Sequence, residues 1–205
     1  DCFGPPEAKT AQLEGGLSAY ARLDQLAAKV NPGSAGLFLL PHFQGQRSPD
    51  FNPAATGIFF GITKSHTRGH FFHAVLESFG YELRRGLEEC YPEGLTLDRV
   101  VATGGGARSP LWRQVVSDIT GFRQEYIPEA NSSLGDAYLA GIALGWYEDF
   151  QQLKDGWVEV KAITEPDPAN QHIYGQLFPF YCSLHNAVDE SYWQHYHMMK
   201  NAGGE

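Results

Sequence analysis

The strongest chemical signal in the sequence is a glycine-rich turn, GGGARSP at residues 104–110. Because glycine has no Cβ, the backbone of this turn can approach a ligand closely. Ser109 suits the N-cap of a following helix and Pro110 suits its first turn, and the amide groups of a helix start favour polar or anionic ligands. The spacing fits neither the dinucleotide-binding GxGxxG pattern nor a P-loop. Alone, the turn indicates only that a backbone comes close to something.

A second glycine segment, SLGDAYLAG, occupies residues 133–141. Gly135 again allows a close approach at a helix start. Tight packing between helices explains Ala140 and Gly141 better than a ligand does. For Gly135 and Asp136, ligand contact and helix packing are equally good explanations.

The third segment is a polar, proline-rich loop at residues 41–53, which lies between two apolar stretches. Long loops between strands often carry function. An arginine buried in this loop, Arg47, could clamp a substrate. It could equally be a structural residue whose guanidinium is satisfied by carbonyl groups, and both readings stay open.

The histidines do not indicate a metal site. His66, His70 and His73 have helical spacing, but no HExxH motif, cysteine or carboxylate cluster accompanies them. A solvated or capping role suits them better. His195 and His197 read as surface residues, and we predict no metal ligand in this chain.

These segments need elements to position them. Periodicity and turn residues predict helices over residues 17–30, 67–90, 109–120 and 134–147, and strands over 36–40, 58–62, 99–102 and 122–127. In the longest helix, apolar residues at steps of three and four form one face: Phe72, Leu76, Phe79, Leu83 and Leu87. Alternating strands and helices predict an α/β protein with a largely parallel sheet. The aromatic tail predicts one amphipathic helix that docks on the body.

Taken together, the segments resemble the FGGY family of carbohydrate kinases, and their sequences are most similar to the xylulokinase-like branch. The resemblance covers about residues 36–150. It runs in order through LLP at 39–41, GQRSP at 45–49, NPAATGIFFG at 52–61, HTRGH at 66–70, AVLES at 74–78, GGGARSPLW at 104–112, SDI at 117–119 and GDAYLAG at 135–141. Single motifs are unspecific, whereas the ordered set is strong.

The resemblance implies the C-terminal lobe of a two-lobed sugar kinase with an actin-like, ribonuclease-H-like ATPase fold, incomplete at its N-terminal edge. It implies ATP and Mg²⁺ as cofactors and a ketopentose such as xylulose, or a related polyol, as substrate. Many relatives have alanine where this chain has Asp136, so that residue could simply cap its helix. By analogy, the ATP-binding residues would be Gly104, Gly105, Gly106, Ala107, Arg108, Ser109, Gly135 and Asp136, with Arg47 as a substrate-loop candidate.

The family's Asp-x-Gly-Thr phosphate loop, its Gly-Thr-Ser hairpin and its general-base aspartate have no counterpart in this sequence. We expect these catalytic parts upstream of Asp1, in an N-terminal lobe of the same protein. This chain would then form one kinase domain over residues 1–205, with an entry helix and linker (1–35), an α/β core (36–150) and a C-terminal aromatic helix (151–205). Without the other lobe we expect it to be inactive.

Composition limits the alternatives. Of the 205 residues, 42% are hydrophobic and 19% charged, which suits a globular chain. The formal net charge of −9 argues against nucleic acid as a partner, and no apolar stretch is long enough to span a membrane. Three scattered cysteines favour a cytoplasmic location. A degenerate actin-like module without catalysis remains the rival hypothesis. An open sheet edge could also make the chain fold poorly alone or form a homodimer.

Overall fold

The structure is a computed structural model that describes residues 18–202, apart from the side chains of Lys154 and Asp155. The elements run along the chain as follows: α2 (Ala19–Ala27), η1 (Ser34–Gly36), β1 (Phe38–Leu40), β2 (Ile58–Phe60), α3 (Arg68–Cys90), β3 (Val101–Ala102), η2 (Gly106–Arg108), α4 (Pro110–Thr120), β4 (Gln124–Tyr126), α5 (Ser132–Ala143), α6 (Gln151–Gly156), β5 (Ala162–Thr164), α7 (Pro168–Ala187) and α8 (Asp189–Asn201). The predicted α/β class is confirmed.

The strands form two small sheets. β1 and β2 pair antiparallel, while the second sheet has the order β3-β4-β5, with β3 at an edge. Of the strand pairs in the described residues, only β3–β4 is parallel. The prediction of a largely parallel sheet is therefore wrong. It missed β5, because a three-residue Ala-Ile-Thr strand is too short to show an alternating pattern.

Helix α3 begins and ends where the sequence predicts. Thr67 is the N-cap of α3 and forms a capping box with His70. The predicted apolar face is only partly buried, because Phe79 and Leu83 are 51% and 46% exposed. The buried face instead includes Glu77, a charged residue that periodicity places outside the core. Neighbouring helices, rather than the apolar stripe, therefore decide which side of α3 is covered.

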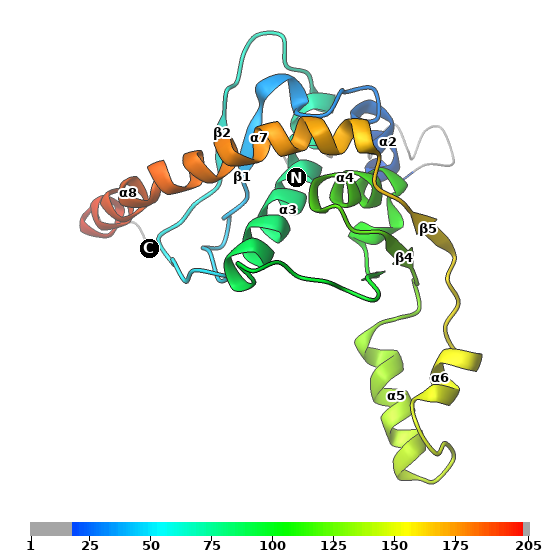
Figure 1. Ribbon diagram of the computed structural model, residues 1–205. Helices are drawn as coiled ribbons and strands as arrows, with labels where there is room; N and C mark the ends of the chain where they lie inside the picture. Colours follow the sequence, from blue (N-terminus) through cyan, green and yellow to red (C-terminus); the bar gives the residue numbers. More distant parts are fainter. Residues whose placement is uncertain (1–17, 203–205) are drawn as a thin grey trace.

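The C-terminal segment closes the core. Figure 1 shows α7 lying across α3 and α4. Its side chains Tyr174, Phe178 and Tyr181 are buried, and the Tyr181 ring stacks on Tyr81 of α3 with ring centroids 4.7 Å apart. The predicted docking on the body is confirmed. The prediction of a single tail helix is wrong, since residues 151–202 form α6, β5, α7 and α8.

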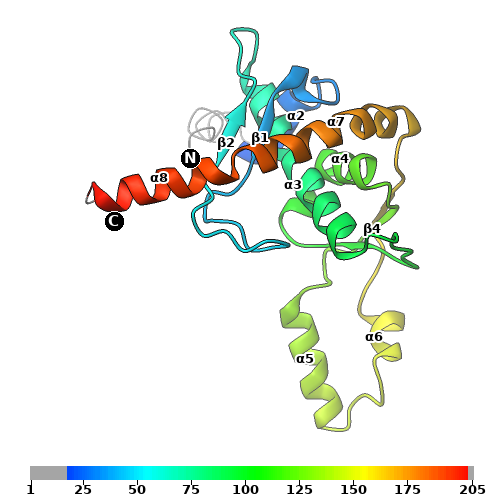
Figure 2. The same ribbon diagram turned by 60° about the vertical axis from the view of Figure 1, so that its left-hand side comes forward.

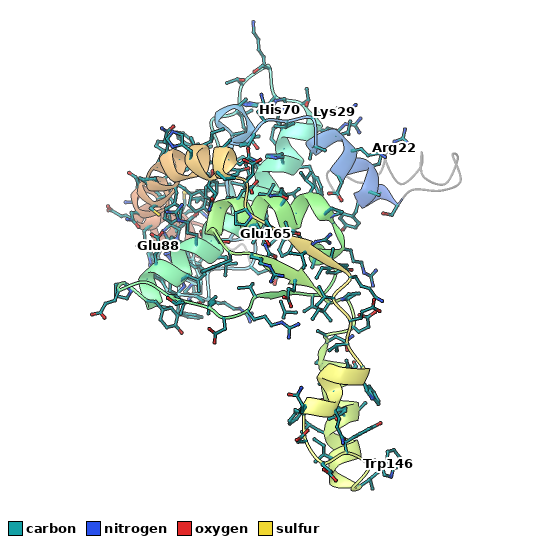
Figure 3. The ribbon with its side chains drawn as sticks, turned by 45° about the vertical axis from the view of Figure 1, so that its right-hand side comes forward. Arg22, Lys29, His70, Glu88, Trp146 and Glu165 are labelled. Carbon is teal, nitrogen blue, oxygen red and sulfur yellow. The ribbon has the colours of Figure 1, made fainter. Side chains whose placement is uncertain are left out.

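Helices α5 and α6 extend away from the body as an arm (Figures 1 and 2). Tyr138 stacks on Tyr147 within this arm, with ring centroids 4.5 Å apart. A Cβ on Gly141 would lie 2.6 Å from the Tyr147 ring, so close packing at this glycine is confirmed, against an aromatic ring. Ala140 is exposed, so the packing predicted for it is not found. Trp146, 72% exposed, stands at the tip of the arm (Figure 3).

Two further observations concern the cysteines and the possibility of a membrane-spanning helix. Cys90 and Cys182 are free thiols, and Cys2 lies outside the described residues. Among residues 18–202, no helix combines the length and the apolar character needed to cross a bilayer.

Two glycines of α3 provide a test of the packing. A Cβ at Gly69 would lie 2.7 Å from the backbone oxygen of Leu26 in α2, whereas one at Gly86 would meet only Pro49, at 3.8 Å. We expect Gly69→Ala to destabilise the fold by about 1–3 kcal/mol, because backbone must move. Gly86→Ala is expected to stabilise it by about 0.5–1 kcal/mol, since alanine favours helix. Urea unfolding of both variants measures the difference, and equal effects would contradict the α2–α3 contact.

Candidate functional site

The glycine turn joins β3 to α4. Gly104 has a φ of 81°, a left-handed conformation that favours glycine, while Gly105 has right-handed helical angles. The chain then forms the short η2 turn. Ser109 caps α4 by accepting a hydrogen bond from the Trp112 amide at 3.0 Å, and Pro110 is the first helical residue. The predicted cap and first-turn proline are both confirmed.

Arg113 of α4 holds the η2 turn in place. Arg113 is buried and donates a hydrogen bond to the carbonyl oxygen of Ala107. Its guanidinium also lies over the Tyr126 ring, 4.3 Å from the centroid. Ala107 is fully buried, backbone included, so the ligand contact predicted for it is not found, whereas Arg108 is exposed. Helical periodicity predicts that an arginine in an amphipathic helix is exposed, so the burial of Arg113 is not predictable from the local sequence.

The second glycine segment lies beside the first. β3 and β4 are parallel, so the turns that follow them leave the same edge of the sheet. The Thr103 hydroxyl donates a 2.6 Å hydrogen bond to the carbonyl of Ala130, which ties the glycine turn to the residues before α5. Asn131 caps α5 by accepting from the Leu134 amide at 3.0 Å. Both glycine segments therefore follow the carboxyl ends of neighbouring parallel strands, a place where ligands commonly bind in α/β proteins.

The structure tests two explanations that the sequence left open, helix capping by Asp136 and helix packing at Gly135. Asp136 is exposed in α5 and does not cap it, because Asn131 does; the capping role suggested for Asp136 is wrong. A Cβ at Gly135 would meet nothing within 4 Å, and the same holds at Gly104 and Gly105. Packing within the described residues therefore does not explain glycine at Gly105 or Gly135. The space leaves room for a ligand, and ligand contact at these two glycines stays a prediction.

A carboxylate from outside the predicted segments joins this edge. Asp24 of α2 forms a side-chain hydrogen bond with Ser109. Burial raises the pKa of the Asp24 carboxyl, and the Ser109 hydrogen bond opposes that shift. Asp24 thus connects α2 to the start of α4, next to the glycine turn. Its contact spans 85 positions of sequence, which no local pattern predicts.

Arg47 lies in the loop at residues 41–53. Its side chain is exposed, so the prediction of an arginine buried in the loop is wrong. The loop is anchored on another side of the molecule: Asn52 donates to Asp189 of α8 at 2.7 Å, and Asp50 accepts from Arg85 of α3 at 3.3 Å. These contacts do not bring Arg47 to the glycine turn.

The histidines have different roles from one another. His70 accepts a hydrogen bond from the Thr67 amide at the start of α3, which confirms a capping role for it. His66 accepts from the Thr63 amide within the turn before α3 and caps no described helix. The prediction is wrong for His73, which is 3% exposed and hydrogen-bonds to Ser34 at 3.0 Å. His195 and His197 are exposed on α8, as predicted.

The candidate site is an open surface in this chain. A cavity of about 270 Å³ lies between the C-terminal ends of α3 and α4, with Tyr91 and Thr120 in its wall, and no residue of the glycine turn lines it. The candidate site at the glycine turn is therefore separate from this cavity.

The chain is similar to known carbohydrate kinases. Gluconokinase from Bacillus subtilis (strain 168) is 36% identical over 200 residues, which are 95% of this chain and 38% of that protein. Xylulose kinase from Escherichia coli (strain K12) is 38% identical over 62% of this chain and 27% of that protein. The crystal structure of ligand-bound xylulose kinase from Lactobacillus acidophilus superposes with a TM-score of 0.76 at 26% identity, covering 94% of this chain and 39% of that one.

The chain thus spans about two fifths of the length of these relatives or less. Similar solved structures of sugar kinases bear out the predicted actin-like fold of a C-terminal lobe. The family model described as "FGGY family of carbohydrate kinases, C-terminal domain" matches residues 6–144. By this match the chain belongs to the FGGY family of carbohydrate kinases and contains the family's C-terminal domain.

Proposed function

We propose that the protein containing this chain is an ATP-dependent carbohydrate kinase and that this chain supplies the adenosine side of its ATP site. The observation that carries the proposal is the meeting of the glycine turn and the start of α5 at one sheet edge, tied by the Thr103–Ala130 hydrogen bond. Family membership supports it.

The residues at this edge fit a nucleotide. Space for a ligand remains where a Cβ at Gly105 or Gly135 would point. Arg108 is exposed beside the turn and Ser109 stands at the start of α4, so the edge offers a cation and helix-start amides. Gly106, which is exposed, would contribute backbone, and the buried Ala107 would support the turn. In this assignment Asp136, exposed on α5, borders the nucleotide.

Phosphoryl transfer needs more than this edge provides. Mg²⁺ would neutralise charge on the phosphates, and a base would orient the attacking hydroxyl. Mg²⁺ prefers oxygen ligands, whereas none of the residues assigned here except Asp136 offers a carboxylate. We therefore assign the metal and the base to the other lobe, and we assign no catalytic residue in this chain.

The substrate class follows from the relatives' names and stays open among them. Similar proteins are named gluconokinase, xylulose kinase and glycerol kinase. We propose a sugar, a sugar acid or a polyol, with a ketopentose such as xylulose as the first choice and Arg47 as a residue of the substrate loop. A cytoplasmic location and a homodimer remain predictions.

Coupled ADP-release assays on the full-length protein test the proposal. The panel is D-xylulose, D-gluconate and glycerol, with ATP and Mg²⁺ in excess. We expect ADP release that depends on one of these acceptors. ATP binding without acceptor-dependent ADP release would favour the degenerate binding module instead, and absence of ATP binding would contradict the nucleotide assignment itself.

A further inference from the structure

Three side chains that are far apart in the sequence come together at the loop of residues 41–53, to which one of them belongs. His42 follows β1, Glu82 belongs to α3 and His185 to α7. One ligand atom from each lies within 4.8 Å of the others. His42 and His185 are both 5% exposed, and the Glu82 side chain is 18% exposed. This group is separate from the glycine turn.

Both imidazoles turn a buried nitrogen without a hydrogen-bond partner into the molecule. His185 Nε2 lies 3.0 Å from Gln46 Oε1, and Nε2 is the donor when Gln46 has this amide orientation. His185 Nδ1 is then a bare lone pair, and it has no partner. His42 Nε2 is also buried without a partner. Leaving two such atoms unsatisfied is costly unless another species occupies them.

The charges around the group favour a cation. Imidazole binds metals in its neutral form, through a ring nitrogen that carries no proton. The Arg85 guanidinium, the nearby positive charge, is shared among Asp50, Glu82 and Glu89. Carboxylates therefore outnumber it. Tyr181 donates to Glu82 Oε1 at 2.7 Å, which orients the carboxylate as outer hydrogen bonds orient metal ligands.

We propose that His42, Glu82 and His185 bind a late first-row divalent cation such as Zn²⁺. Two imidazole nitrogens and one carboxylate form a known zinc ligand set, with water as the fourth ligand, whereas Mg²⁺ prefers oxygen alone. Metal–ligand distances of about 2.1 Å would bring the ligand atoms to about 3.4 Å from one another, so the group contracts on binding.

The bound cation would tie the loop at residues 41–53 to α3 and α7. Because the ligands come together only in the folded chain, binding stabilises that state. This role goes beyond the proposed kinase function and does not depend on it.

Metal titration of the chelator-treated full-length protein tests the site. We expect one Co²⁺ per chain, with the visible absorption of a tetrahedral nitrogen–oxygen site, displaced by Zn²⁺ and unaffected by millimolar Mg²⁺. Zn²⁺ should also raise the Tm. Removing one ligand, in His185→Gln or His42→Gln, should weaken Zn²⁺ binding by more than about 100-fold, since even outer-shell changes cost 10–100-fold.

His172→Gln is the matched control, because His172 is exposed on the same helix as His185. It should bind Zn²⁺ as the parent does. Equal weakening in the control, or no saturable binding, would overturn the proposal.

A measurement on the unaltered protein guards against variants that misfold. Of the eight imidazoles in this chain, Zn²⁺ should shift the ¹⁵N NMR signals of two, those of His42 and His185. Shifts confined to exposed histidines would also overturn the site.

Discussion

Replacing Glu77 by alanine is expected to lower the free energy of unfolding by about 3–5 kcal/mol, because it removes the acceptor of a buried hydrogen-bond network. Glu77 is 2% exposed in the middle of α3. It accepts from the Gly33 amide at 2.6 Å, from the Ser34 hydroxyl at 2.7 Å and from the Tyr174 hydroxyl at 2.9 Å. One carboxylate thus joins three parts of the chain.

The backbone that Glu77 holds is itself strained. Gly33 and Gly36 have φ values of 88° and 83°, and between them Ser34 and Ala35 have 49° and 54°. Left-handed conformations cost non-glycine residues roughly 1–2 kcal/mol each. The hydrogen bonds from Gly33 and Ser34 to Glu77 offset this cost, so the turn before β1 should loosen in Glu77→Ala.

Urea unfolding followed by circular dichroism measures this change. Glu88→Ala is the matched control, since Glu88 is on the same helix, 57% exposed and paired with a partly exposed Arg84. We expect its effect to stay within about 0.5 kcal/mol. Ser34→Ala removes one of the hydrogen bonds and should cost about 1–2 kcal/mol. If Glu77→Ala unfolds at the same urea concentration as Glu88→Ala, the network does not hold the fold.

The burial of Glu77 could not be predicted from the sequence, whereas the helix caps could. The Thr67 cap, the Ser109 cap and the ends of α3 follow from neighbouring residues, and the structure confirms them. The burial of Glu77 and Arg113 depends on partners brought near by packing, such as Tyr174 and the Ala107 carbonyl. A periodicity argument assigns charged residues to the surface, so it fails where tertiary hydrogen bonds satisfy a buried charge.

The candidate site divides in the same way. Glycine spacing within one turn predicts the start of α4, and the family resemblance connects it with Gly135. The parallel β3–β4 pair explains why those two segments meet. Asp24, by contrast, reaches Ser109 only through the packing of α2. The group His42, Glu82 and His185 is invisible in sequence for the same reason, because three separate elements supply it.

Gly105→Ala and Gly135→Ala should weaken ATP binding by about tenfold or more without destabilising the fold, where tenfold corresponds to about 1.4 kcal/mol. In the protein alone, a Cβ at either position meets nothing within 4 Å. Both residues have right-handed backbone angles in which alanine is unstrained, so Gly135→Ala should even add about 0.5–1 kcal/mol of helix stability. Only a ligand seated against the backbone would meet the added methyl groups.

Gly175→Ala is the matched control for these variants. Gly175 is exposed within α7, and a Cβ there also meets nothing within 4 Å. It should gain the same helix stability and leave ATP binding unchanged. Calorimetric titration of ATP into the full-length protein and its variants gives the Kd values, and thermal unfolding gives the stability.

The two readouts separate the possible explanations. Weaker ATP binding with unchanged stability would place the nucleotide against the glycine turn and the start of α5. Unchanged ATP binding in both Gly105→Ala and Gly135→Ala would remove that assignment, even if the full-length protein proved to be a kinase. Weaker binding in Gly175→Ala as well would show a general effect of added helix stability. The glycines at this sheet edge are therefore testable as ligand contacts, because the chain's own packing does not require glycine at Gly105 or Gly135.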